Sequence, residues 1–398
     1  MTKLKKRQSA TLALLSALGP FQFDTYLPAL PALMIFMATN DVMVQLTITA
    51  SLLGMAAGQL FVGPITDAMG RRKPLLVALS VFIVSAFSCL MSTDISWMIG
   101  SRFILGFSAA AGFVIVNAYI RDVAIGDGAA KLYSTQAAIS SLAPVVAPLV
   151  GGQLLLIGDW HIVFLFLVFM GAFVMAFVLL FLPETLPVEN RSQLSFKSTF
   201  GSWKFILRDS RFVVFALVAG LLFGSIAVFI SGAPFALEGE PFHLTPTQYT
   251  YAFASTTIVM FAANSINRAL LHKFAAITLL RYGLMQATFT ALLMIGAIVF
   301  SYHSLVLTLI AFALSVSVMG FTQANIMGLA MQKHGERAGV AAGIIGFSTS
   351  LFGALAAPLT SMIFGLDVVG VTLFMSILFI VAALLGFFGQ RKDNAPKP

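Results

Sequence analysis

The sequence has few charged residues and a single cysteine, and these shortages exclude several classes of protein. Asp, Glu, Lys and Arg make up 10% of the 398 residues, whereas 59% are hydrophobic and the mean hydropathy is +0.97. A water-soluble globular chain of this length does not need so much apolar surface. Because Cys89 stands alone, an intrachain disulfide is excluded and a thiolate metal site is not expected.

Residues that carry catalytic or cofactor chemistry are also scarce. The five His residues fall at the ends of apolar runs or between them, which disfavours a buried histidine ligand cluster, and we expect no metal. No Walker A motif is present, so direct ATP hydrolysis is not expected. A membrane-embedded enzyme would need buried His, Cys or paired carboxylates, and the apolar runs offer Asp24 alone. The chain is therefore predicted not to be an enzyme and to need no cofactor beyond a proton gradient.

What the sequence does have is a series of apolar runs, each long enough to cross a bilayer as a helix of about 20 residues. We count twelve, and predict an all-α membrane protein with twelve transmembrane helices. The runs lie near 9–35, 43–66, 74–92, 96–120, 130–157, 161–182, 212–236, 247–270, 276–299, 304–332, 338–364 and 368–390.

Positive charge is confined to alternate breaks between these runs. Of the 23 Lys and Arg residues, only Arg102 lies inside a run, and the other 22 fall on one side. The opposite breaks hold acidic residues and no Lys or Arg. The positive-inside rule places the basic side, with both termini, in the cytoplasm. Orientation and contact with anionic lipid then explain the net charge of +8, and we predict a multi-pass protein of the bacterial inner (plasma) membrane that binds no nucleic acid.

The longest break divides the chain into halves. We predict an N-terminal six-helix bundle (1–182), a central cytoplasmic loop (183–211) and a C-terminal six-helix bundle (212–398). Such halves are usually structural repeats related by an axis along the membrane normal. The recurrence of Ala147-Pro148-Leu149 as Ala357-Pro358-Leu359 supports that symmetry.

Two ionisable residues, Asp24 and Arg102, lie within the apolar runs, and both fall in the outer half of the membrane by this count. A charge at such depth costs at least about 2.5 kcal/mol and usually faces a cavity or an opposite charge. Two interpretations stay open: a static structural ion pair, or a titrating carboxylate near a fixed cation. Burial and attraction to Arg102 act in opposite directions on the Asp24 carboxyl.

The break between runs 43–66 and 74–92 carries a recognisable motif, Gly63-Pro-Ile-Thr-Asp67-Ala-Met-Gly70-Arg71-Arg72. Gly63 allows a neighbouring helix to approach, Gly70 permits a tight turn, and Asp67 can cap a helix start or pair with a basic residue. The stretch resembles the signature loop of the major facilitator superfamily, Gly-x-x-x-Asp-Arg-x-Gly-Arg-Arg, with Ala68 in place of the first Arg. The resemblance implies a major facilitator fold and a cytoplasmic gate formed by Gly63, Asp67, Gly70, Arg71 and Arg72.

Three further stretches resemble drug:proton antiporters, especially the bicyclomycin-resistance (Bcr/CflA) group. They are Asp24-Thr-Tyr-Leu-Pro-Ala-Leu-Pro31, Arg102-Phe-Ile-Leu-Gly106 and Ala147-Pro-Leu-Val-Gly-Gly152; Leu105 stands where Gln is common, and Ala147 where Gly is common. The resemblance implies that Asp24 and Arg102 serve proton coupling. It also implies an antiporter motif, Pro144, Pro148, Gly151 and Gly152, in a helix that bends and packs closely. Pro148 would favour a kink, and Gly54 with Gly58 would allow close helix crossing.

A transported ligand needs a cavity near the midplane, between the halves. Candidate lining residues are polar or aromatic groups within the runs, although each could instead pack or satisfy an interhelical hydrogen bond: Tyr26, Asn117, Gln136, Phe223, Phe229, Asn264, Gln286, Gln323 and Asn325. The 38 Phe and 18 Met residues suit a deformable apolar pocket.

The sequence thus predicts a proton-coupled secondary transporter that exports drug-like molecules (multidrug or antibiotic efflux) by alternating access. Its expected partners are a small lipophilic or amphiphilic substrate, protons and membrane lipid, with the chain acting as a monomer. Export rather than import rests on the antiporter-like stretches alone. The alternatives are a proton-coupled carrier of a metabolite, such as a sugar, amino acid or siderophore, a membrane-embedded enzyme, and a ligand sensor without flux.

Overall fold

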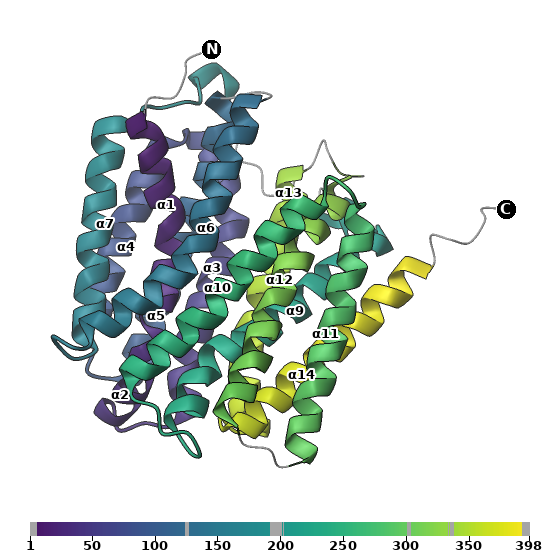
Figure 1. The fold of residues 1–398 in the computed structure, drawn as a ribbon. Coiled ribbons are helices and arrows are strands. Elements are labelled where there is room, and N and C mark those ends of the chain that lie inside the picture. Colours follow the sequence, from purple (N-terminus) through teal and green to yellow (C-terminus); the bar gives the residue numbers. More distant parts are fainter. Residues whose placement is uncertain are drawn as a thin grey trace. The chain divides into compact units, whose positions relative to one another are not determined.

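The computed structural model describes residues 6–123, 127–191, 201, 203–300, 304–332, 334 and 338–391 (Figure 1). These residues form helices, turns and loops, and no strand occurs among them. The chain forms two compact units, Met1–Phe196 and Lys197–Pro398. The division between the units falls within the stretch 183–211.

The first unit is a bundle of long helices that run side by side (Figure 1). Its elements are α1 (Lys6–Asp24), η1 (Leu27–Ala29), α2 (Leu30–Phe36), α3 (Asp41–Met69), α4 (Arg72–Leu90), α5 (Ile95–Val123), α6 (Asp127–Leu154), α7 (His161–Phe181) and η2 (Val188–Asn190). Packing is most extensive between α3 and α5. Helix α4 also packs on α7, and α1 packs on α6. Asn40 caps α3 by accepting the N–H of Met43 at 3.0 Å, which satisfies one of the free donors at the helix start.

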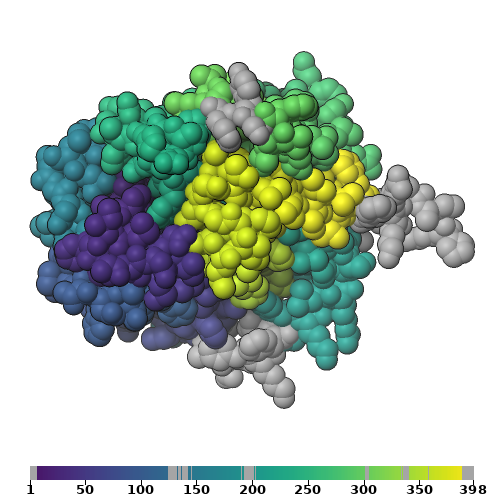
Figure 2. All heavy atoms as spheres, turned by 90° about the horizontal axis from the view of Figure 1, so that it is seen from below, coloured from purple at the N-terminus to yellow at the C-terminus, as the bar shows by residue number. Residues whose placement is uncertain are grey.

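The second unit is built around α9. Its helices are α9 (Ser210–Glu238), α10 (Pro246–Leu270), α11 (Ala276–Val299), α12 (Leu305–Met331), α13 (Ala338–Ile363) and α14 (Val368–Arg391). Helix α9 packs on α13 and α14, and α12 packs on α10 and α11. Part of α14 lies at the surface (yellow in Figure 2), where Val381 and Leu384 are exposed apolar side chains, as expected of a helix in contact with lipid.

Among the described residues, nine helices are long and apolar enough to cross a membrane: α3, α4, α5, α7, α9, α11, α12, α13 and α14. The chain is therefore an all-helical, multi-pass membrane protein. Helices α1, α6 and α10 are also long but fall outside this set. A total of twelve spans and a cytoplasmic position for both termini stay predictions.

The first predicted span, 9–35, is not one continuous helix. Helix α1 ends at Asp24, and the chain continues through η1 into the short α2. Pro28 and Pro31 explain the break, since neither has a backbone N–H to donate to the carbonyl four residues earlier, that of Asp24 and that of Leu27. Hydropathy does not register this effect, so the prediction of a single helix was wrong. Asp24 consequently stands at a helix end within the apolar run.

Glycines bring the backbones of α3 and α5 into direct contact. A Cβ atom added to Gly54 would lie 2.0 Å from the carbonyl oxygen of Phe103, and one on Gly58 would lie 2.5 Å from that of Phe107. From the opposite helix, a Cβ on Gly106 would lie 1.9 Å from the carbonyl oxygen of Ser51. The close crossing predicted for Gly54 and Gly58 is confirmed, and it places Ser51 beside the part of α5 that carries Arg102.

Candidate functional site

Arg102 is the centre of a buried polar cluster in the first unit. Its side chain is fully buried, and its Nη1 donates to the backbone carbonyl of Gln22 at 2.9 Å and to the Gln22 side-chain Oε1 at 3.2 Å. The hydroxyl of Ser51 donates to the same Oε1 at 2.9 Å. Gln22 therefore connects α1 with both α3 and α5.

Aromatic rings from α1 and the residues that follow it complete the surroundings of the guanidinium. Its Cζ lies 4.6 Å from the ring centroid of Tyr26 and 5.8 Å from that of Phe23. The Tyr26 hydroxyl lies 3.1 Å from the hydroxyl of Thr47 on α3, which fixes the ring. The positive charge is thus stabilised by ring faces and amide oxygens.

Asp24 lies close in sequence to this cluster but is not joined to it. It is buried, with 6% of its surface exposed. In the part of the chain that the structure describes, no ion pair or hydrogen bond links its carboxylate to Arg102. Of the two interpretations open from the sequence, the static Asp24–Arg102 ion pair is therefore not the arrangement found.

The cluster retains unused hydrogen-bonding groups. Within the described residues, Nε and Nη2 of Arg102, Nε2 of Gln22 and Oγ1 of Thr25 are buried without a hydrogen-bond partner. Buried polar groups normally find partners, and water or a ligand can supply them. Such a cluster can form new hydrogen bonds without losing existing ones.

The helix α6 motif packs against the break after α1. A Cβ on Gly151 would lie 2.2 Å from the backbone carbonyl oxygen of Thr25. Pro148 and Gly152 are buried beside it, and Pro144 lies half-buried one turn earlier. The motif thus reaches the residue that follows Asp24, so a shift of the α1 break must be transmitted to α6.

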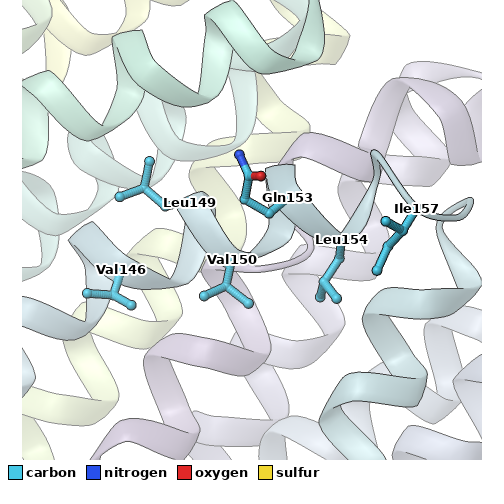
Figure 3. Close-up of a pocket in the computed structure, with 6 residues that line it drawn as sticks. All are labelled: Val146, Leu149, Val150, Gln153, Leu154 and Ile157. Atoms are coloured by element: carbon cyan, nitrogen blue, oxygen red, sulfur yellow. The ribbon is translucent and has the colours of Figure 1, made fainter.

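A pocket lies next to this motif, on the exposed face of α6. Val146, Leu149, Val150, Gln153, Leu154 and Ile157 surround an open cavity of about 300 Å³ (Figure 3). Of the described residues that line it, Gln153 alone is polar. An apolar pocket with one polar group suits a lipophilic molecule or a lipid chain.

The second cluster contains the motif between α3 and α4. Arg71 is 3% exposed and forms ion pairs with Asp67 and, at 2.9 Å, with Asp122 at the end of α5. The pairing of Asp67 with a basic residue is confirmed, and it connects the α3–α4 turn to α5. A Cβ added to Gly63, in contrast, would meet no atom within 4 Å among the described residues. A role for Gly63 in helix approach at a gate stays a prediction.

Glu184, after α7, holds the start of α4. Its carboxylate accepts the backbone N–H groups of Arg71 at 2.8 Å and Arg72 at 3.1 Å, as well as those of Thr185 and Leu186. Partial burial opposes ionisation, but these four donors outweigh it and hold the pKa of Glu184 below its usual value. Gly70 (φ +89°) is required here, because a Cβ would lie 2.6 Å from Glu184 Oε2.

Replacing Glu184 with Gln is expected to destabilise the first unit at neutral pH by about 1 kcal/mol. Hydrogen bonds to a charged acceptor are stronger than bonds to a neutral one, but the partial exposure of this carboxylate reduces the difference. Because the pKa of Glu184 is lower in the folded state, its contribution is present above the unfolded pKa of about 4.3 and is lost as the pH falls through the folded value. Thermal unfolding of purified protein across this pH range measures the difference.

The matched control is Glu189→Gln, which alters an exposed carboxylate in the same segment. It is expected to leave the melting temperature unchanged at every pH. If the melting temperatures of the wild type and Glu184→Gln differ by the same amount at neutral and at acidic pH, the ionic role of Glu184 is contradicted.

Several predicted cavity residues make interhelical contacts inside the second unit. Asn325 Nδ2 donates to Asn267 Oδ1 at 2.9 Å and so joins α12 to α10. Gln286 on α11 donates to Ser317 and, at 3.2 Å, to the carbonyl of Leu314 on α12. For these two residues, the structure shows the interhelical bonding that the sequence left open as an alternative.

The other candidates are placed differently. Phe229 is buried and stacks on Phe253 with ring centroids 5.2 Å apart, and Phe223 packs against Gly353 of α13. The remaining candidates are four amides: Asn117 and Asn264 donate to carbonyls of their own helices, Gln136 is buried, and Gln323 is exposed. A substrate-binding role for all these residues stays a prediction.

The sequence gave no partner role to Gln22, Ser51, Asp122 or Glu184, which bond Arg102 and Arg71 directly or, in the case of Ser51, through Gln22. The first two are uncharged and so gave no signal in an apolar run. The position of Asp122 beside Arg121 at the end of an apolar run could have indicated a gate partner. No group of three or more His, Cys, Asp or Glu side chains that could hold a metal occurs in the described ranges.

A multi-pass helical protein with a buried cation, a buried carboxylate at a helix break and glycine-packed helices has the architecture of a membrane transporter and not of an enzyme. The chain belongs to the Major Facilitator Superfamily, whose family model matches residues 12–358.

Curated relatives span nearly the whole chain. An uncharacterized MFS-type transporter, YdgK of Bacillus subtilis, is 32% identical over 392 residues, which cover 96% of this chain and 95% of that protein. The bicyclomycin resistance protein homolog of Haemophilus influenzae is 29% identical and covers 96% of each chain. The multidrug resistance protein MdtL of Shewanella oneidensis is 25% identical over 84% of each chain. These relatives support the resemblance of the sequence motifs to the drug-efflux group, and they imply a small-molecule substrate.

Solved structures share the fold at lower identity. The xylose transporter XylE from E. coli, in a partially occluded inward-open conformation, matches with a TM-score of 0.75 and 14% identity, covering 96% of each chain. The human organic anion transporter MFSD10 matches with a TM-score of 0.70 and 19% identity, covering 96% of this chain and 99% of that one. Both matches confirm the predicted major facilitator fold.

Proposed function

We propose that this protein is a proton-coupled secondary transporter that exports drug-like small molecules across the bacterial inner membrane by alternating access. It acts as a monomer, uses the proton gradient and needs no cofactor. The observation that carries the proposal is the buried Asp24 carboxyl, which stands at a helix break and forms no ion pair with Arg102 among the described residues. The names of the relatives, bicyclomycin and multidrug resistance proteins, favour lipophilic or amphiphilic drugs as substrates.

The mechanism follows from the energetics of a charge in the membrane. A proton on Asp24 removes a buried negative charge, and a substrate that favours the ionised form displaces that proton. Because linkage is reciprocal, such a substrate binds more weakly at low pH. The contact between Gly151 and Thr25 transmits a change at the α1 break to α6. Arg102 with its unpaired donors is the candidate relay group for the proton.

The second cluster, around Arg71, supplies a cytoplasmic gate within the first unit. Arg71 joins Asp67 on α3 to Asp122 on α5, and Glu184 joins the α4 start to the segment after α7. These ion pairs and hydrogen bonds stabilise one arrangement of the cytoplasmic helix ends. Transport requires that they rearrange when the access side changes.

Proton release tests the proposal. Chloramphenicol-type antibiotics and lipophilic cations are added to detergent-purified protein in weak buffer, and the pH change is recorded. We expect release by at least one compound, with apparent affinity that falls as the pH is lowered. Absence of release with every compound, together with sugar or amino-acid uptake by proteoliposomes, would instead identify a metabolite carrier.

A further inference from the structure

Gln22 has contacts that the proposed function does not explain. It is fully buried, and its side-chain oxygen accepts hydrogen bonds from Ser51 and Arg102 while its backbone carbonyl accepts a second bond from Arg102. It precedes the antiporter-like stretch that begins at Asp24. Gln22 joins three helices and accepts two hydrogen bonds from the buried guanidinium, so it constrains where Arg102 lies.

The position of Arg102 needs such a constraint. In apolar surroundings a guanidinium and a carboxylate attract each other strongly, and Asp24 is only two residues from Gln22 on α1. Residues two apart on a helix point to different sides, so the Gln22 contacts draw Arg102 away from the side of Asp24. The faces of Tyr26 and Phe23 support the same position.

No other described ionised group competes for Arg102 in this region. The nearby groups that can titrate are Asp24 and Tyr26 on or just after α1 and Cys89 on α4. Helix α3 presents uncharged partners, Thr47 and Ser51. The charged residues of α3 and the histidine of α7 lie at the helix ends.

We propose that Gln22, oriented by Ser51, is the positioning residue of Arg102: it holds the guanidinium apart from Asp24 and so leaves that carboxyl free to exchange its proton. The consequence for antiport rests on the proposed function, whereas the effect on Asp24 itself does not. Gln22 acts through Arg102 and touches no transported molecule.

The substitution Gln22→Met tests this role, because it removes the acceptor and keeps the side-chain length. Arg102 then keeps its bond to the backbone carbonyl of residue 22 but loses the one to the side chain, and its other, unpaired nitrogens are expected to shift toward Asp24. An opposite charge at close range favours the carboxylate, so the midpoint of the Asp24 titration is expected to fall by about one pH unit or more, a tenfold change in proton affinity. Gln22→Glu keeps the acceptor oxygen, and its midpoint is expected not to fall.

A serine pair provides a gentler variant and its matched control. Ser51→Ala removes the bond that orients the Gln22 amide, and a smaller shift in the same direction is expected. Ser108→Ala removes another buried hydroxyl, one that donates within its own helix to the carbonyl of Leu105 at 2.8 Å. This control is expected to leave the midpoint unchanged.

The readout is infrared difference titration of the substrate-free, full-length protein. The carbonyl band of the protonated carboxyl is assigned to Asp24 by its loss in Asp24→Asn. An unchanged midpoint in both folded Gln22→Met and Ser51→Ala, or a wild-type Asp24 that does not titrate, would overturn the proposal; if Gln22→Met elutes as aggregate, Ser51→Ala decides alone. This titration uses no substrate, so it is independent of the proton-release experiment. If the variants shift the Asp24 midpoint as expected but no drug releases protons, the proposed function is refuted and this inference stands.

Discussion

Replacing Asp24 with Asn is expected to reduce proton-driven export by about 100-fold or more, the loss typical of removing a positioned proton-transfer group. Asparagine has nearly the same shape as aspartate but cannot take up a proton. Since Asp24 forms no ion pair with Arg102 in the described structure, the substitution breaks no such bond. Drug accumulation inside inverted vesicles with an imposed proton gradient measures the effect, because the lumen of these vesicles corresponds to the outside of the cell.

Coupling and folding are separated by a second assay on the same variant. Exchange of labelled for unlabelled substrate needs no net proton movement, so Asp24→Asn is expected to retain it. The matched control, Asp41→Asn, alters a carboxylate in the first turn of α3 and is expected to retain both activities. Full gradient-driven export by Asp24→Asn would exclude Asp24 as the coupling residue.

Replacing Gly106 with Ala is expected to destabilise the first unit by about 3 kcal/mol, the upper part of the usual cost of overpacking. The added Cβ would lie 1.9 Å from the carbonyl oxygen and 2.9 Å from the Cα of Ser51. These are backbone atoms of a helix, so no side chain can rotate away and the two helices must separate. Separation also strains the Ser51–Gln22 hydrogen bond.

The melting temperature in detergent measures this effect. Gly100→Ala on the same helix is the control, because no atom lies within 4 Å of its added Cβ, and better helix propensity is expected to raise stability slightly. Equal melting temperatures for the Gly106 and Gly100 variants would show that α3 and α5 do not depend on this contact.

The sequence predicted the features that depend on hydropathy and charge. Apolar runs of about 20 residues located the long helices, and Asp24 and Arg102 stood out because charges inside such runs are rare. The relation between these two residues could not be predicted, since it depends on Gln22, an uncharged residue one half-turn earlier. The break after Asp24 was missed because hydropathy does not weigh the backbone effects of Pro28 and Pro31.

The cavity candidates show a second limit of sequence reasoning. A polar side chain in an apolar run needs a partner, but the sequence does not say whether that partner is a substrate or another helix. Asn325 finds Asn267, and Gln286 finds Ser317. The motif between α3 and α4 was easier to interpret because an entire pattern of glycines and charges is needed for its turn.

The contact of Glu184 with the start of α4 also fixes an order of events during biosynthesis. Arg71 and Glu184 are 113 residues apart, and α4, α5, α6 and α7 lie between them in the chain. As the ribosome delivers the chain from its N-terminus, the turn before α4 has no cap until the segment after α7 has emerged. The first unit therefore closes the end that holds the α3–α4 turn last, and a nascent chain that stops before Glu184 is left with an uncapped helix start.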